Sequence, residues 1–209
     1  MTGGGAGTRD DVGAGPPREW IDGCLAAQAL LDEAIRGLDD ATARSPSQLP
    51  EWSVGHVLTH IARNADSVVW RLEGARRGEL RDQYPGGLDQ RRQDIEAGAG
   101  RPAGELVADV RDSSAAVALV MAELSDEAWE APSRTSRGVV EPSRDAVFSR
   151  WREVVVHQGD LGLGPVPLPP TLVAVWLARE LPRLGERTDA AALLAWVIGR
   201  GNAPELAPW

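Results

Sequence analysis

The sequence predicts an all-α protein organised as a helical bundle. Apolar residues recur at spacings of three and four positions in four long segments, which is the period of a core-facing helix stripe. Stretches rich in Pro, Gly and Ser separate these segments and mark where helices end. With 209 residues, of which 43% are hydrophobic and 25% charged, the chain has the length and composition of a globular protein with a sizeable core.

The first predicted helix follows a glycine-rich tail. Residues 1–17 lack an apolar pattern, so we expect them to be disordered. From Arg18 the pattern turns helical, and Ser and Pro residues in 41–50 break it. The apolar stripe of this helix consists of Trp20, Ile21, Cys24, Leu25, Leu31, Ile35 and Leu38.

A second helix is predicted to begin after Ser53, a good N-cap residue. Its apolar face consists of Val54, Val57, Leu58, Ile61, Ala65, Val68, Val69 and Leu72. His60 lies on the border of that face, whereas His56 lies nearly opposite. His60 is therefore the better candidate to point into a bundle, and we expect His56 in solvent or near the helix start. The alternative for His60 is a boundary histidine whose hydrogen bonds are satisfied.

A long charged connection follows over residues 74–102. It holds few large apolar residues, and we expect a short helix at about 88–97. Connections of this length in compact domains are often functional or mobile. Its arginines are the nearest cations for an anionic substrate, and the alternative is an ordinary solvated charged face.

Two further long helices complete the predicted bundle. The apolar stripe of the third consists of Leu106, Val107, Val110, Val117, Met121 and Leu124. Residues 133–140 fit either a small hairpin or an irregular loop. The fourth helix runs from Arg144 to about Gly159, and apolar residues cover most of its circumference. A helix that is apolar nearly all round is predicted to be central.

Glu153 and His157 on this fourth helix form the strongest candidate site. They are four residues apart, so they share one helix face and can hold a metal ion from one side. Burying a lone carboxylate is costly unless it is paired or bound to metal. The chain has three histidines, so a third ligand from another helix has few candidates beyond His56 and His60. The alternative pairs Glu153 with an arginine and leaves His157 hydrogen-bonded in the core.

The chain beyond the bundle is predicted to be a short helical extension. Residues 162–170 are rich in Pro and Gly, and two helices are expected at 172–184 and 189–198. The predicted organisation is a disordered tail at 1–17, a four-helix bundle at 18–163 and a short extension at 164–209.

Composition and charge argue against several classes of partner and location. The net charge of −9 argues against nucleic-acid and anionic-membrane partners. No apolar run approaches the roughly 20 residues of a membrane span, and no signal-peptide pattern is present, so we expect a cytoplasmic protein. The single cysteine, Cys24, excludes an intrachain disulfide and a Cys-rich zinc site, and we expect it to be a buried structural thiol. We expect a monomer or a homodimer.

Two motifs resemble the mycothiol-dependent maleylpyruvate isomerase family, a branch of the DinB-like four-helix bundles. The resemblance covers about Trp20 to Gly162. The motifs are Trp52-Ser53-x-x-His56-Val57-Leu58-x-His60-Ile61-Ala62-x-Asn64-Ala65 and Arg152-Glu153-Val154-x-x-His157-x-x-Asp160-Leu161-Gly162.

The resemblance implies an up-up-down-down bundle that binds one divalent metal, usually zinc, through His60, Glu153 and His157. Asp160 matches the family's Asp-Leu-Gly, with a structural or supporting role for its side chain. The implied cosubstrate is mycothiol, a sugar-inositol-cysteine thiol whose pKa the metal lowers. In the isomerases the thiolate adds to the cis double bond of maleylpyruvate, rotation follows, and elimination gives fumarylpyruvate.

The predicted activity is therefore that of an isomerase or thiol S-transferase acting on a small-molecule electrophile, including an anionic one. The resemblance makes Arg91, in the long connection, and Arg200, in Gly199-Arg200-Gly201, candidate catalytic residues. The isomerases carry a substantial α/β domain after the bundle, and here residues 164–209 offer only helices. Two alternatives stay open: a metal-dependent hydrolase that activates water, and a non-catalytic small-ligand-binding or stress-response protein.

Overall fold

The computed structural model describes residues 15–206. The chain divides into two compact units, residues 1–166 and residues 167–209. Most of the predicted disordered tail at 1–17 lies outside the described residues.

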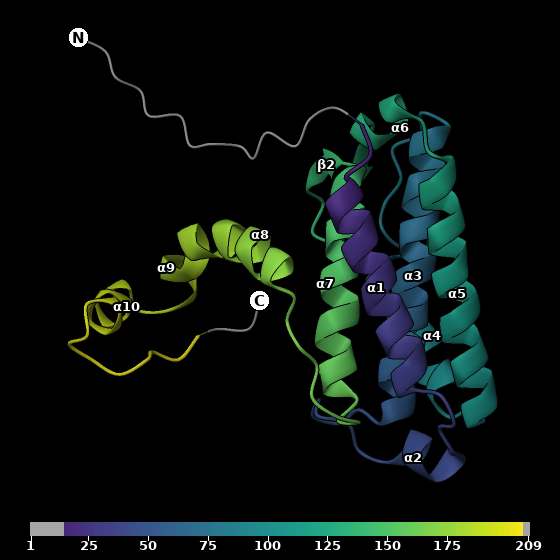
Figure 1. The fold of residues 1–209 in the computed structure, drawn as a ribbon, viewed down its shortest axis with the longest axis horizontal. Coiled ribbons are helices and arrows are strands. Elements are labelled where there is room, and N and C mark those ends of the chain that lie inside the picture. Colours follow the sequence, from purple (N-terminus) through teal and green to yellow (C-terminus); the bar gives the residue numbers. More distant parts are fainter. Residues whose placement is uncertain (1–14, 207–209) are drawn as a thin grey trace. The chain divides into compact units, whose positions relative to one another are not determined.

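Four long helices form the first unit (Figure 1). They are α1 (Arg18–Ala34), α3 (Val54–Arg76), α5 (Ala103–Glu123) and α7 (Arg144–Asp160). Helix α1 packs against α7, and α3 packs against both α5 and α7. The helices enclose an apolar core that includes Leu31, Leu58, Leu72, Leu106 and Trp151. The predicted all-α bundle is confirmed.

Short elements connect the long helices. They are α2 (Asp40–Arg44), α4 (Gly87–Ala99), α6 (Asp126–Glu130), β1 (Pro132–Arg134) and β2 (Val140–Pro142). Helix α4 matches the short helix expected in the charged connection, whereas α2 was not predicted. Asp39 explains α2, because its Oδ1 accepts a hydrogen bond from the Thr42 amide at 2.8 Å and so caps the helix.

The undecided segment at 133–140 belongs to a two-stranded antiparallel hairpin, in which Ser133 lies opposite Glu141. Arg71 of α3 anchors this hairpin to the bundle. The buried guanidinium donates to Ser133 Oγ at 2.7 Å and to Glu141 Oε1 at 2.8 Å. The hairpin is thus fixed through side chains that sequence periodicity does not reveal.

The expected roles of Cys24 and His56 are confirmed. Cys24 is a free thiol with no exposed surface, and burial raises its pKa to about 11. His56 lies at the start of α3, where its Nδ1 accepts from the Ser53 amide at 3.1 Å while Ser53 Oγ accepts from the His56 amide. This reciprocal capping box occupies His56 at the helix terminus.

Helices α3 and α4 approach each other closely at Gly55. A Cβ atom built on Gly55 would overlap the carbonyl oxygen of Ala99. We therefore expect Gly55→Ala to lower the free energy of unfolding by about 1–3 kcal/mol, as overpacking of a core does. Urea unfolding measures the loss. The control is Gly104→Ala in α5, where a Cβ meets nothing within 4 Å and helix propensity alone favours alanine. Equal stability of the two variants would contradict the prediction.

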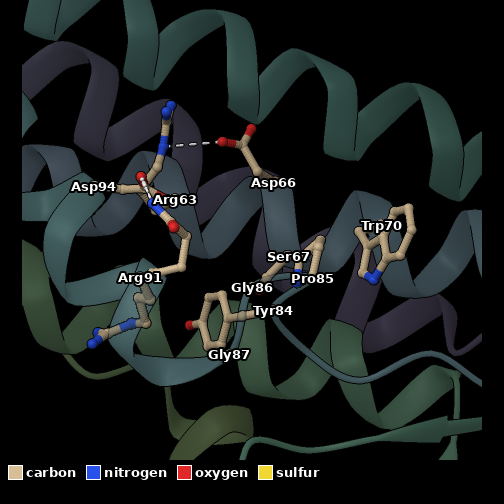
Figure 2. A pocket seen from close by; sticks show the side chains of 11 residues that line it. Arg63, Asp66, Ser67, Trp70, Tyr84, Pro85, Gly86, Gly87, Arg91 and Asp94 are labelled. Carbon is tan, nitrogen blue, oxygen red and sulfur yellow. Dashed lines mark hydrogen bonds and ion pairs between the residues drawn. The ribbon is translucent and has the colours of Figure 1, made fainter.

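A cavity of about 310 Å³ lies between α3, the turn that precedes α4, and α4 itself (Figure 2). Trp70 and Tyr84 supply its aromatic surface, and Arg63 and Arg91 its cations. Arg63 is held by carboxylates, because its Nε lies 3.0 Å from Asp66 Oδ2 and its Nη2 2.6 Å from an Asp109 oxygen. Arg91, the other cation of the lining, contacts His60 of the neighbouring histidine cluster.

The second unit is helical over its described residues. It contains α8 (Pro170–Glu180), the 3-10 turn η1 (Leu181–Arg183), α9 (Leu184–Arg187) and α10 (Ala190–Val197). These match the two helical segments expected there, with a break at η1. Within residues 15–206, none of the helices combines the length and the apolar character that a membrane span requires.

Candidate metal centre

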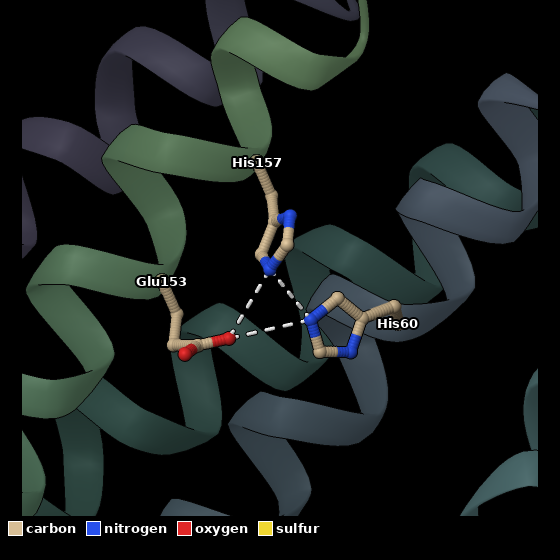
Figure 3. Close-up of side chains that lie close together, drawn as sticks. All are labelled: His60, Glu153 and His157. Carbon is tan, nitrogen blue, oxygen red and sulfur yellow. Dashed lines mark hydrogen bonds and ion pairs between the residues drawn. The ribbon is translucent and has the colours of Figure 1, made fainter. Parts of the chain in front are cut away.

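Helices α3 and α7 bring His60, Glu153 and His157 together (Figure 3). His60 Nε2 lies 2.9 Å from His157 Nε2 and 3.3 Å from Glu153 Oε2. The distance from His157 Nε2 to the same Glu153 oxygen is also 3.3 Å. The two residues of α7 are one helical turn apart, so both project toward His60 from the same face.

The cluster is largely shielded from water. His60 is 3% exposed as a residue, and the Glu153 and His157 side chains are 17% and 16% exposed. The two imidazole rings lie nearly perpendicular, with centroids 4.3 Å apart. The edge-on ring of Trp52 lies 5.7 Å from the His60 ring. A carboxylate and two imidazoles therefore lie together in a confined site.

Asp160 fixes the orientation of His157. Its Oδ2 lies 2.8 Å from His157 Nδ1, and the N–H group at Nδ1 donates a hydrogen bond to the carboxylate. This hydrogen bond turns Nε2 toward Glu153 and His60. Metal-binding histidines are typically oriented in the same way, by a carboxylate on the second ring nitrogen.

Arg91 of α4 contacts the other histidine. Its Nη2 lies 2.8 Å from His60 Nδ1. A guanidinium only donates hydrogen bonds, so Nδ1 accepts here and neutral His60 carries its proton on Nε2. The structure therefore places Arg91 beside the cluster as well as at the wall of the cavity (Figure 2).

Arg200 lies in the second unit, in the turn after α10. Its backbone amide donates to the Ala195 carbonyl at 2.7 Å, and the residue is exposed. Its proposed catalytic role stays a prediction.

The three side chains of the cluster have different charges at neutral pH. Burial lowers the pKa of His60 to about 4, so the ring is neutral. Burial acts in the same direction on His157, but hydrogen bonds to Asp160 and Glu153 outweigh it and raise the pKa of His157 to about 9. Burial would raise the pKa of Glu153, yet hydrogen bonds from His157 and His60 hold it well below its ordinary value. The metal-free cluster is thus an anion, a cation and a neutral imidazole.

The geometry and chemistry of these donors fit a tetrahedral metal site. Zinc binds imidazole nitrogen and carboxylate oxygen at about 2.0–2.1 Å, which gives a tetrahedron with edges of about 3.3 Å. The three donor atoms are separated by 2.9, 3.3 and 3.3 Å. Two imidazoles and one carboxylate also leave a fourth position open, as in catalytic zinc sites.

The sequence comparisons give one family match. The model of the mycothiol maleylpyruvate isomerase N-terminal domain matches residues 24–162. A comparison with curated proteins gives no match.

Two solved structures share the fold. The mycothiol-dependent maleylpyruvate isomerase aligns with a TM-score of 0.80 at 19% identity, covering 93% of this chain and 97% of that one. A histidine-to-alanine mutant of the mycothiol-dependent maleylpyruvate isomerase aligns with a TM-score of 0.74 at 23% identity, covering 78% of this chain and 69% of that one. The family match spans most of the bundle and all three clustered residues. The chain therefore belongs to the mycothiol maleylpyruvate isomerase N-terminal domain family.

Proposed function

We propose that the protein is a mycothiol-dependent metalloenzyme that holds one zinc ion on His60, Glu153 and His157. The observation that carries this proposal is the convergence of three ligand atoms, each within 3.3 Å of the others, with His157 oriented by Asp160. When bound, the metal would supply a lowered thiol pKa and so a thiolate nucleophile at neutral pH.

The protein's own residues would prepare the site and hold the electrophile. Asp160 keeps the His157 proton on Nδ1 and leaves Nε2 as the ligand atom. A metal on His60 Nε2 requires the remaining proton of that ring to sit on Nδ1, where Arg91 now donates. Metal binding and the Arg91 contact are therefore incompatible. Once released, the guanidinium is a cation beside the site for an anionic group of the electrophile.

The neighbouring cavity has room for one small-molecule electrophile beside the cluster. Its volume of about 310 Å³ lies at the lower end of the range of small-molecule sites. In an isomerisation the sulfur would add to the double bond, the resulting single bond would rotate, and the sulfur would leave. In a transferase reaction the sulfur would stay on the product.

We also propose that the enzyme is cytoplasmic, that it acts on small-molecule substrates and that it is a monomer or a homodimer.

Turnover with and without thiol tests this function. Zinc-loaded protein would be incubated with maleylpyruvate and with a panel of other electrophiles, each with and without mycothiol. We expect product only when mycothiol is present. Turnover of amide or thiol-conjugate substrates without added thiol would instead identify a hydrolase, and binding without turnover across the panel would identify a non-catalytic protein.

The Asp160 carboxylate is expected to contribute to metal affinity. Asp160→Ala removes the acceptor that holds His157 Nδ1. Loss of such an outer partner lowers metal affinity by about 10–100-fold. Competition with a chromophoric chelator measures the change, and Gln158→Ala on the same turn is the control. Equal affinities of the two variants would show that His157 needs no support from Asp160.

A further inference from the structure

Arg150 connects all four long helices of the bundle. The residue lies in α7 with no exposed surface. Its guanidinium donates to Gln28 Oε1 of α1 at 3.3 Å and to Ser114 Oγ of α5 at 3.4 Å. Toward α3 it donates to the Ile61 carbonyl at 2.7 Å and to Asn64 Oδ1 at 2.9 Å. One side chain thus bonds its helix to the other three.

Burying a guanidinium whose hydrogen-bond acceptors are uncharged often lowers the stability of a core compared with an apolar side chain. Burying a charge carries a large desolvation penalty, and apolar residues of similar volume often give equal or greater stability. Burial accordingly lowers the pKa of Arg150. The stability of the bundle alone therefore does not account for an arginine at this position, which points to a role in arranging the helices.

The contacts of Arg150 lie next to the clustered ligands on both helices. On α7, Arg150 is one turn before Glu153 and two turns before His157. On α3, Ile61 directly follows His60, and Asn64 is one turn beyond it. The two shortest hydrogen bonds of the guanidinium therefore join α7 to α3 beside the point where His60 meets Glu153.

We propose that Arg150 is a positioning residue that fixes α3 against α7, so that His60, Glu153 and His157 converge on one metal ion. The metal in this statement rests on the proposed function. Arg150 acts through the helices and touches none of the three ligand atoms. The planar guanidinium of an arginine can donate hydrogen bonds to acceptors in several directions at once. The single ammonium of a lysine would lose some of these hydrogen bonds.

Cobalt binding by the full-length protein tests the proposal. Cobalt(II) reports both affinity and ligand geometry through its visible absorption. Arg150→Met removes the charge and the donors, and Arg150→Lys keeps the charge but loses the fork. We expect at least about tenfold weaker cobalt binding and a changed spectrum for Arg150→Met, with a smaller change for Arg150→Lys.

The matched control is Leu72→Ala in α3. Leu72 is fully buried and lies twelve residues beyond His60, about 18 Å along the helix. Its truncation disturbs the core without touching the α3–α7 bonds of Arg150, so we expect affinity within about twofold of wild type. Wild-type affinity and spectrum in Arg150→Met would overturn the proposal, as would equal losses in Leu72→Ala. Should Arg150→Met not fold, the same comparison applies to Arg150→Lys.

A metal-free measurement separates this proposal from the proposed function. If the wild-type protein binds no cobalt, the metal centre fails, and a crystal structure of metal-free Arg150→Met decides about Arg150. We expect the distance from His60 Nε2 to Glu153 Oε2 to exceed the wild-type 3.3 Å. An unchanged distance would overturn the positioning role.

Discussion

His157→Ala is expected to abolish stoichiometric zinc binding and, with it, thiol-dependent turnover. The variant leaves one histidine and one carboxylate, which is too few protein ligands for a typical catalytic zinc site. The loss should exceed the 10–100-fold caused by removing an outer partner of a ligand. Elemental analysis of the purified protein should give about one zinc per wild-type chain and none in the variant.

His56→Gln is the matched control for this experiment. It removes an imidazole from the same protein, but glutamine can still complete the capping box with Ser53. We expect His56→Gln to retain zinc. A wild-type protein without metal, even after incubation with zinc, would refute the metal centre and leave Glu153 and His157 as polar residues of the core.

The apparent zinc affinity is expected to rise about tenfold per pH unit between roughly pH 5 and pH 8 and to level off near pH 9, which is about 50-fold between pH 7 and pH 9. In this range metal-free His60, with a pKa of about 4, is neutral, whereas His157, with a pKa of about 9, still carries a proton that zinc must displace. Calorimetry at pH 7 in buffers of different ionisation enthalpy should detect about one proton released per zinc. No proton release would contradict the assigned charge of His157.

The shifted pKa values of His60 and His157 also predict how the free energy of unfolding of the metal-free protein varies with pH. The folded pKa of His157 is raised above 6.5, so its contribution is fully present below pH 6.5 and is lost as the pH rises through 9. The folded pKa of His60 is lowered, so its contribution is present above pH 6.5 and is lost as the pH falls through 4. Both losses should be visible in urea unfolding with a chelator present.

The sequence predicted the cluster of His60, Glu153 and His157 because the signals for it are local. The four-residue spacing places Glu153 and His157 on one face, and the border position of His60 turns that ring into the bundle. The small number of histidines restricted the choice of the third residue. The structure brings these three side chains together as the helical patterns imply.

The features that the sequence did not predict depend on contacts between distant segments. The Arg91 guanidinium reaches His60 because α4 packs closely on α3 at Gly55, and no periodicity encodes that approach. Arg150 has acceptors on three other helices, so its position in an apolar helix was the only available signal. Helix α2 begins at the Asp39 cap and overlaps a segment in which Ser and Pro predict a break.

His60 and His157 are 97 residues apart in the chain and lie on different helices, which has a consequence for the lifetime of the protein. An ion held by both would act as a reversible cross-link between the second and the last helix of the bundle. Its binding free energy would add to the folding free energy by mass action. Resistance to proteases would then rise and fall with the zinc supply, and metal starvation would reduce the amount of the protein as well as its activity.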